Sequence, residues 1–357
     1  MKDSLDGAFD LSDYIIDANG FIPVPIIITE PALGGFGFGF VPVFLKRQAP
    51  FIDSVNGTVK ITPVPPNITG GIGLYTLNKT WVLAGFRSGT FRKSRIKYLI
   101  GGGYGNINMS YYRTVQQLGE KEFAFNIKTP MLMLQAIKRI GISNWYAGLK
   151  YLFLKTDVEY TGNRLLPPGW IKPIEYSSIV SQLGAVTEFD NRDNIFTPNS
   201  GLKLHADIIC SDNILGSDYD YWRSNYYMYA YKALSKKLVG GWRIDGQQAF
   251  EDPPFFMKPY VDMRGIPSNR YSGNADILTE VEFRWDFYKR WSIMGYGGTG
   301  KAFDKWSEFG PAELVYSYGT GFRYLVARKF KLRMGVDIAR GPEEFAYYIV
   351  FGSTWLK

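Results

Sequence analysis

Residues 279–287 read Thr-Glu-Val-Glu-Phe-Arg-Trp-Asp-Phe, a strict alternation of charged and large apolar side chains. Successive side chains of an extended strand point to opposite faces, so this segment has one charged and one apolar face. The charged face holds Glu280, Glu282, Arg284 and Asp286, and the apolar face holds Val281, Phe283, Trp285 and Phe287. The pattern recurs at residues 202–210 and 330–338. It is typical of transmembrane β-barrels, whose strands face lipid on one side and a polar lumen on the other.

The composition fits a membrane barrel better than a pair of soluble domains. Aromatic residues make up 17% of the 357 residues, and 25 of these aromatics are Tyr, which suits the membrane–water boundary because one end is apolar and the other wet. No run of about 18 apolar residues indicates a membrane-spanning helix. The single Cys excludes a disulfide framework and a cysteine-based metal site, and we expect no cofactor.

The formal net charge of +8 is scattered among strands and turns rather than gathered in one basic patch. Nucleic-acid binding requires such a patch, so we expect no nucleic-acid partner. A lumen or rim that favours anions, or a face toward anionic lipid, accounts for the charge better. The chain begins without a signal-peptide pattern, and we expect it to be the mature or recombinant form of an exported protein.

Sixteen strand-like segments follow one another from residue 21 onward, and an even number is the rule for bacterial single-chain barrels. The predicted strands are residues 21–29, 34–45, 69–77, 80–91, 94–113, 122–137, 143–158, 176–190, 200–211, 219–234, 237–248, 274–288, 290–303, 313–327, 329–341 and 344–357. We therefore predict an all-β fold, a sixteen-stranded antiparallel transmembrane β-barrel over residues 21–357. Residues 1–20 form an N-terminal periplasmic extension, in which Asp10 or Ser12 could cap a short helical turn.

The direction of each strand follows if the last strand ends in the periplasm. The long connections 159–175 and 249–273 then lie outside the cell, where long loops belong. The short links at 197–200 and 235–236 lie on the periplasmic side.

Segment 46–68 fits this scheme badly. It would be a long periplasmic connection, yet it carries Asn56-Gly57, a strong hairpin-turn signal. The sequence therefore leaves open whether the region near the N-terminus contains one strand more or fewer than predicted above. Pro23 and Pro25 restrict the predicted strand 21–29 to an edge or a strand start, because proline has no N–H to donate to a neighbouring strand.

Three stretches stand out against the strand pattern. Residues 190–201 read Asp-Asn-Arg-Asp-Asn-Ile-Phe-Thr-Pro-Asn-Ser-Gly, a charged turn followed by a Pro…Gly reversal into the next strand. Residues 263–267 read Met-Arg-Gly-Ile-Pro in the longest predicted loop, and residues 296–300 read Tyr-Gly-Gly-Thr-Gly. Together they resemble the outer-membrane superfamily of BamA, TamA and the two-partner secretion transporters, often described as bacterial surface antigens. The motifs cover about residues 180–357.

The resemblance implies roles for particular residues. In that family an Arg-Gly motif in the sixth extracellular loop folds back into the lumen, and its Arg pairs with acidic residues on the next two strands. Carried over to this chain, the loop arginine is Arg264, its glycine is Gly265 and an acidic partner is Glu282. The periplasmic turn motif of the family corresponds to Asp190, Arg192, Asp193, Pro198 and Gly201.

The chain departs from the family pattern in three places. The second acidic partner aligns with Gly298, which leaves Glu282 as the only acidic anchor that the family pattern predicts. The usual terminal aromatic residue is absent from the closing segment 352–357. Residues 1–20 are too short to hold a POTRA domain, the periplasmic module that receives client proteins in the family, so we expect a POTRA-less member.

An arginine in a barrel lumen has to be paired, because an unpaired buried charge costs several kcal/mol. Arginine and a carboxylate can form two parallel hydrogen bonds of fixed geometry. We therefore expect Arg264 and Glu282 to tether the predicted loop inside the barrel and occlude the lumen. The alternative is that Arg264 is an ordinary exposed loop residue.

Other polar features favour simpler interpretations. His205 lies on the polar face of a strand with no second His in the chain, so we interpret it as a lumen residue rather than a metal ligand. Cys210 lies on an apolar face, and we expect it to contact lipid. The glycine-rich segment 101–105 lacks the Lys-Ser/Thr of a phosphate-binding loop and fits a bend in a barrel strand. No Ser-His-Asp arrangement is recognisable, so we expect no enzyme.

The resemblance implies a bacterial outer-membrane protein that takes part in protein assembly or translocation. Its first and last strands would pair weakly, so that the wall opens sideways and an edge with unpaired backbone groups templates an incoming strand. We expect it to contact outer-membrane lipids and to act through a protein partner. A plugged pore or structural scaffold, and a membrane anchor for a surface complex, are the alternatives.

Overall fold

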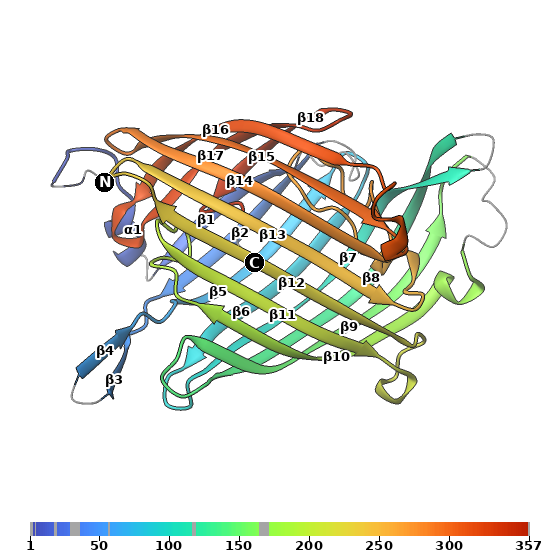
Figure 1. The fold of residues 1–357 in the computed structure, drawn as a ribbon, viewed down its shortest axis with the longest axis horizontal. Coiled ribbons are helices and arrows are strands. Elements are labelled where there is room, and N and C mark those ends of the chain that lie inside the picture. The colour runs from blue at the N-terminus through green and yellow to red at the C-terminus, as the bar shows by residue number, and fades with distance from the viewer. Residues whose placement is uncertain are drawn as a thin grey trace.

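The computed structural model describes residues 3, 5–17, 20–28, 36–55, 58–115, 119–163 and 171–355. Within this part of the chain, sixteen strands form one antiparallel sheet rolled into a barrel (Figure 1). The strands of the barrel are β1 (Phe21–Ile28), β2 (Gly37–Lys46), β5 (Asn67–Thr76), β6 (Trp81–Phe91), β7 (Ile96–Val115), β8 (Gly119–Arg139), β9 (Trp145–Tyr160), β10 (Ser177–Asp190), β11 (Gly201–Ser211), β12 (Tyr221–Ala233), β13 (Leu238–Phe250), β14 (Ala275–Tyr288), β15 (Trp291–Phe303), β16 (Val315–Ala327), β17 (Leu332–Arg340) and β18 (Phe345–Phe351). Each pairs with its neighbours in chain order.

Strand β14 shows the division between the two faces of the barrel wall. Glu280 and Glu282 are 2% and 7% exposed, whereas Val281 and Phe283 on the opposite face are 45% and 48% exposed. The charged row therefore faces the lumen, and the aromatic and aliphatic row faces outward, where lipid surrounds such a barrel. The predicted sixteen-stranded antiparallel barrel is confirmed.

Segment 46–68, which did not fit the predicted alternation of strands and loops, contains a hairpin outside the barrel sheet. Strands β3 (Phe51–Val55) and β4 (Thr58–Thr62) pair only with each other, and the predicted turn residues 56–57 lie outside the described part of the chain. The hairpin projects beyond the barrel wall (Figure 1). Asp53 fixes it there, with oxygens 2.6 Å from Arg95 and 2.8 Å from Arg139. The count of sixteen barrel strands is therefore unaffected.

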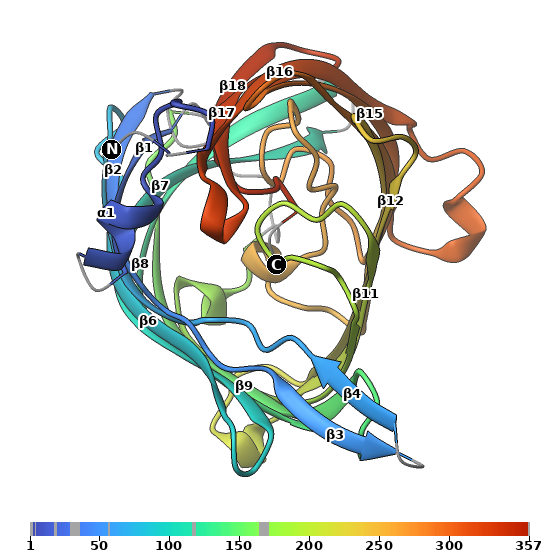
Figure 2. The ribbon, with the colours of Figure 1, turned by 90° about the vertical axis from the view of Figure 1, so that its left-hand side faces the viewer.

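The end of the last strand was predicted wrongly. The sequence prediction runs the strand over 344–357, but β18 ends at Phe351. Gly352 adopts a left-handed backbone with φ of 81°, and its N–H donates to the Arg333 carbonyl at 2.7 Å. A glycine tolerates this conformation without strain and turns the chain out of the wall. The C-terminal tail, residues 352–355, then enters the lumen (Figure 2).

The N-terminus lies at the short-turn end of the barrel, at the left of Figure 1, whereas the C-terminus lies near the middle of that view, inside the barrel (Figure 2). The N-terminal segment contains one short helix, α1 (Ser12–Asp17), where a helical turn is predicted. No helix among the described residues is long and apolar enough to cross a membrane. The opposite, long-loop end carries the connection between β13 and β14, which folds back inside the ring of strands (Figure 2). The family loop predicted at 249–273 is this connection.

Candidate functional site: the lumen cluster and the seam

Arg264 lies inside the barrel and is surrounded by carboxylates. Its guanidinium nitrogens lie 3.1 Å from a Glu282 oxygen, 3.0 Å from an Asp337 oxygen and 3.6 Å from a Glu280 oxygen. The guanidinium carbon also sits 3.4 Å from the centre of the Tyr296 ring, in cation–π geometry. The side chain of Arg264 is 7% exposed. The structure therefore brings together Arg264 and Glu282 and does not place Arg264 on the surface.

The backbone around Arg264 is attached to the wall as well. The Arg264 carbonyl accepts a hydrogen bond from the Ser317 hydroxyl, and the Gly265 N–H donates to the Tyr348 hydroxyl at 2.8 Å. Gly265 has φ of 82°, and a Cβ there would lie 3.0 Å from the Gly341 backbone nitrogen. Only glycine suits both the conformation and the space. The loop therefore contacts five consecutive strands, β14 to β18.

Glu282 is not the only acidic anchor, so that part of the sequence prediction is wrong. Asp337 on β17 contacts Arg264 and also forms two hydrogen bonds with Arg323, at 2.6 and 2.9 Å. Gly298 lies opposite Glu280 in the β14–β15 ladder, and a Cβ there would come within 2.5 Å of Glu280 Cγ. Gly298 thus leaves room for the Glu280 side chain, and the second carboxylate comes from a different strand.

These groups belong to one buried network, here called the lumen cluster. It consists of three arginines and four carboxylates: Arg243, Arg264, Arg323, Asp245, Glu280, Glu282 and Asp337. Arg243 joins it through Glu280 and Asp245, each at 2.7 Å. Charges this buried stabilise a fold only when each has a partner, and the near balance of signs meets that requirement.

The C-terminal tail contacts the same cluster. The Trp355 indole N–H donates to a Glu280 oxygen at 3.2 Å, and the Thr354 hydroxyl donates to a Glu282 oxygen at 3.4 Å. Trp355 is 2% exposed and packs against the rings of Tyr229 and Tyr231. The last strand and the lumen loop are therefore linked through two shared carboxylates.

Replacing Trp355 with phenylalanine is expected to lower the free energy of unfolding by about 2 kcal/mol, because a buried hydrogen bond to a charged group is lost while most of the ring packing stays. Urea unfolding of the purified barrel measures the change. The control is Trp242→Phe, which removes an indole hydrogen bond to the neutral Thr279 hydroxyl on the outer face. Equal losses in the two variants would argue against a specific Trp355–Glu280 bond.

The turn motif at 190–201 folds over the short-turn end. Arg192 donates two hydrogen bonds to Asp190, at 3.0 and 2.8 Å. One Asp193 oxygen accepts from the N–H groups of Asn199 and Ser200, and the other lies 3.2 Å from the Lys331 ammonium. These backbone hydrogen bonds lower the pKa of Asp193 against the opposing effect of burial. The motif residues therefore shape the turn and attach it to the β16–β17 connection.

The remaining motif residues have backbone roles. The Pro198 carbonyl accepts from Arg284 at 3.4 Å, which links the turn to β14. Gly201 has φ of 111°, and a Cβ there would lie 2.5 Å from Arg192 Cα. A larger residue at this position would push the chain away from Arg192.

The two ends of the sheet meet without a ladder. Among the described residues, the sheet begins at β1 and ends at β18, and no paired register joins these two strands. We call this junction the seam. An apolar group packs beside it at the short-turn end, where side chains of β1 and β2 contact the 191–200 and β16–β17 turns: Ile22, Val24, Val43, Leu45, Phe196, Ala327, Phe330 and Leu332. Figure 2 shows the β17 end (red) curled inside the ring beside β1 (dark blue).

Two prolines remove N–H donors from the edge of β1 that faces the seam. The Leu45 N–H donates to the Gly20 carbonyl at 2.8 Å, and the β1–β2 register continues from this pair. In an antiparallel ladder alternate residues point their N–H and C=O groups to opposite neighbours. Even-numbered residues of β1 therefore face β2, and odd-numbered ones face the seam. Pro23 and Pro25 are odd-numbered, so the seam edge of β1 lacks two donors.

The β18 edge differs from the β1 edge. The Gly352 N–H donates to the Arg333 carbonyl, so the even-numbered residues of β18 face β17. The odd-numbered residues direct their backbone groups toward the seam, and each has an N–H: Phe345, Tyr347, Ile349 and Phe351. The seam is therefore asymmetric, with a donor-poor edge on β1 and a complete edge on β18.

Comparison with solved structures gives consistent matches. BamA from Haemophilus ducreyi lacking POTRA domains 1–3 aligns with a TM-score of 0.58 at 13% identity, over 92% of this chain and 69% of that one. CdiB from Escherichia coli aligns with a TM-score of 0.61 at 9% identity, over 92% of this chain and 62% of that one. CdiB from Acinetobacter baumannii aligns with a TM-score of 0.59 at 10% identity, over 93% and 58%. The chain has the barrel fold of BamA and CdiB.

The predicted likeness to the BamA and TamA superfamily is thereby confirmed at the level of the fold, which is that of a bacterial outer-membrane barrel. No protein-family model and no curated protein sequence matches the chain. The identities of 9–13% establish the fold alone. The chain spans between 58% and 69% of the lengths of the three solved structures.

Sequence reasoning missed several residues of this BamA/CdiB-type barrel. Asp337 lies on the polar face of an alternating segment, so the sequence indicates that it faces the lumen. The sequence does not show that it pairs with Arg264. Trp355 was assigned to a strand, although Gly352 before it is a signal for a turn. Two single residues were also interpreted from the sequence. His205 lies 2.8 Å from Asp207, and Cys210 is partly exposed.

Proposed function

We propose that this chain is an outer-membrane barrel that takes part in the assembly or translocation of other proteins, together with a protein partner. The observation that supports this most is the seam, where β1 and β18 are the two ends of the sheet and no ladder joins them among the described residues. A wall closed by side-chain packing alone separates at lower cost than one closed by a row of hydrogen bonds. The short-turn end would face the periplasm. The proposal assigns no enzymatic step to the barrel.

The asymmetry of the seam indicates which strand would receive a client. An extended segment binds an exposed edge through main-chain hydrogen bonds, and both donors and acceptors are needed at alternate residues. The β18 edge has both groups at Phe345, Ile349 and Phe351, whereas Pro23 and Pro25 interrupt the β1 edge. The client strand would therefore add to β18.

The hairpin β3–β4 supports the involvement of a partner. Its outer face carries Ile52, Val59 and Ile61, which are 69%, 61% and 65% exposed. Apolar side chains grouped on a projecting hairpin indicate a surface for another protein or for the membrane boundary. Asp53 anchors the opposite face of the hairpin to the barrel, which would hold this surface in a fixed position.

Reconstitution into liposomes tests the proposed function. The purified protein, with any partners that co-purify from native outer membranes, is expected to speed the insertion of an unfolded test barrel by at least several-fold over empty liposomes. Folding is followed by the change in gel mobility of the test barrel. Rates equal to those of empty liposomes, with the partners present, would refute the assembly proposal.

A plugged pore or scaffold is the second candidate. It is favoured by the loop inside the lumen and by a cavity of about 430 Å³ beside the lumen cluster, lined in part by Arg243, Arg264 and Trp355. A pore would conduct in planar bilayers once the loop is released. A membrane anchor for a surface complex is the third candidate, and it requires neither conduction nor insertion activity.

A further inference from the structure

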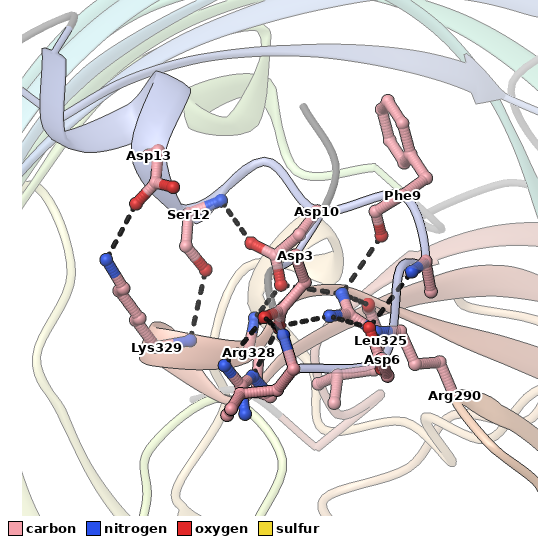
Figure 3. Close-up of polar contacts among 12 residues, drawn as sticks. Asp3, Asp6, Phe9, Asp10, Ser12, Asp13, Arg290, Leu325, Arg328 and Lys329 are labelled. Carbon is pink, nitrogen blue, oxygen red and sulfur yellow. Dashed lines mark hydrogen bonds and ion pairs between the residues drawn. The ribbon is translucent and has the colours of Figure 1, made fainter.

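The N-terminal segment, described at residues 3 and 5–17, lies across the short-turn end and surrounds one arginine. Arg290, in the turn between β14 and β15, has a side chain that is 3% exposed. Asp3, Asp6 and Asp10 each place a carboxylate oxygen against its guanidinium, the last two at 2.7 and 2.6 Å. Figure 3 shows the carboxylates converging on Arg290. All three guanidinium nitrogens of Arg290 therefore donate hydrogen bonds to carboxylates of this segment.

The same segment is attached to the β16–β17 turn. Asp3 lies 2.6 Å from Arg328, and the Arg328 N–H donates to Asp10 at 3.1 Å. The Lys329 N–H donates to the Ser12 hydroxyl at 3.0 Å (Figure 3). Farther inside, the Leu11 N–H donates to the Val326 carbonyl at 2.7 Å. The segment is therefore bound through both its side chains and its backbone.

The position of these contacts matters because of the seam. The segment leads through α1 into β1, which is one edge of the sheet, whereas its contacts lie on the turns that carry β15, β16 and β17, beside the other edge. Leu11 also packs against the apolar group at the short-turn end. The segment thus joins the two sides of a junction that lacks a hydrogen-bond ladder among the described residues.

Two carboxylates of the segment, Asp6 and Asp10, have lowered pKa values. Burial raises the pKa of Asp10, but hydrogen bonds from Ser12, Arg328 and Arg290 outweigh it and lower the pKa to about 2. The hydrogen bond from Arg290 likewise lowers the pKa of Asp6. A carboxylate with a lowered pKa contributes above its ordinary pKa of 3.8 and loses its contribution only as the pH falls toward about 2. Protonation of Asp6 or Asp10 is therefore not the release signal.

We propose that residues 3–17 form a detachable clasp that closes the seam at the short-turn end, and that release of the clasp lets β1 and β18 separate. This inference goes beyond the proposed function, because the clasp would regulate the seam whether or not the barrel assembles other proteins. It follows from the position of one segment, which leads into β1 and contacts the turns beside β18, at a junction with no hydrogen-bond ladder among the described residues.

Two spin-label measurements on the full chain in nanodiscs test the clasp, in a Cys210→Ser background that removes the single native cysteine. A label at Leu5→Cys, which is 75% exposed, reports whether the segment is bound. A label pair at Ile27→Cys on β1 and Ile349→Cys on β18, both on the outer face, reports the width of the seam. Neither readout uses a client, so failure of the assembly proposal leaves this test unaffected.

Arg290→Glu is expected to make the Leu5 label mobile and to shift the distance between the β1 and β18 labels to longer, broader values. The triple variant Asp3→Asn, Asp6→Asn, Asp10→Asn is expected to do the same without altering the barrel turns, and it serves if Arg290→Glu does not fold. Lys289→Glu is the control, because Lys289 is the exposed neighbour of Arg290 and no ion pair is found for it among the described residues.

Two results would overturn the clasp. The Leu5 label could stay immobile in both charge variants, which would mean that the acidic side chains do not hold the segment. Alternatively, the label could become mobile while the β1–β18 distances stay unchanged, which would mean that binding of the segment has no effect on the seam.

Discussion

Replacing Arg264 with alanine is expected to lower the free energy of unfolding by about 4 kcal/mol and to open the lumen to ions. The variant leaves Glu280, Glu282 and Asp337 close together with one counter-charge fewer, and breaking a buried ion pair from one side costs about 3–5 kcal/mol. The same change removes the side-chain contacts that hold the lumen loop to β14, β15 and β17. Urea unfolding measures the stability, and planar-bilayer recordings measure the conductance.

Lys258→Ala is the matched control, because Lys258 lies in the same loop but forms a longer, more exposed pair with Asp304, at 3.7 Å. Its loss is expected to cost less than about 1 kcal/mol and to leave the conductance unchanged. An Arg264→Ala variant that unfolds like Lys258→Ala and does not conduct would show that the loop is held by other contacts.

Replacing both Pro23 and Pro25 with valine is expected to close the seam. The change gives the seam edge of β1 two N–H donors, and each new hydrogen bond to β18 would contribute about 1 kcal/mol. Valine also favours the extended conformation and is apolar, as the outer face requires. The double variant should therefore be more stable by about 2 kcal/mol, show slower amide hydrogen exchange in β18, and lose any assembly activity.

Ile27→Val is the control for this prediction, since residue 27 lies on the same edge and outer face but already has its N–H group. It should change neither exchange nor activity. If the double proline variant exchanges β18 amides as fast as the unaltered barrel, missing donors are not what keeps β1 and β18 apart.

The barrel was predictable from sequence because each strand contacts lipid on one face and the polar lumen on the other. The alternation of Glu280, Val281, Glu282 and Phe283 needs no knowledge of partners, since lipid and lumen act on each residue separately. Segment 46–68 was equally readable as a hairpin from Asn56-Gly57, but its place outside the barrel depends on Asp53 meeting Arg95 and Arg139. Those residues are far apart in the chain.

The lumen cluster was only partly predictable for the same reason. Arg264 and Glu282 were identified through a family resemblance, whereas Asp337 comes from β17 and is positioned by the curvature of the whole wall. The family pattern placed the second acid at Gly298, where the Glu280 side chain already occupies the space. Arg290 gave no signal in the sequence, because its three aspartates lie about 280 residues away.

The roles of Pro23 and Pro25 required the register of β1 against β2. The sequence limits these prolines to an edge, but only the pairing shows that both interrupt the side facing β18. The direction of a backbone N–H depends on which neighbour a strand has, and that neighbour is chosen by the fold.

Site-specific photo-crosslinking at the two edges shows most directly which strand of the seam receives a client. A photoreactive residue replaces Phe345 on β18 or Ile27 on β1, and the reconstituted protein is illuminated while an unfolded test barrel inserts. We expect crosslinks to the test barrel from position 345 and none from position 27. Crosslinks from position 27 alone, or from neither edge while insertion proceeds, would contradict this expectation.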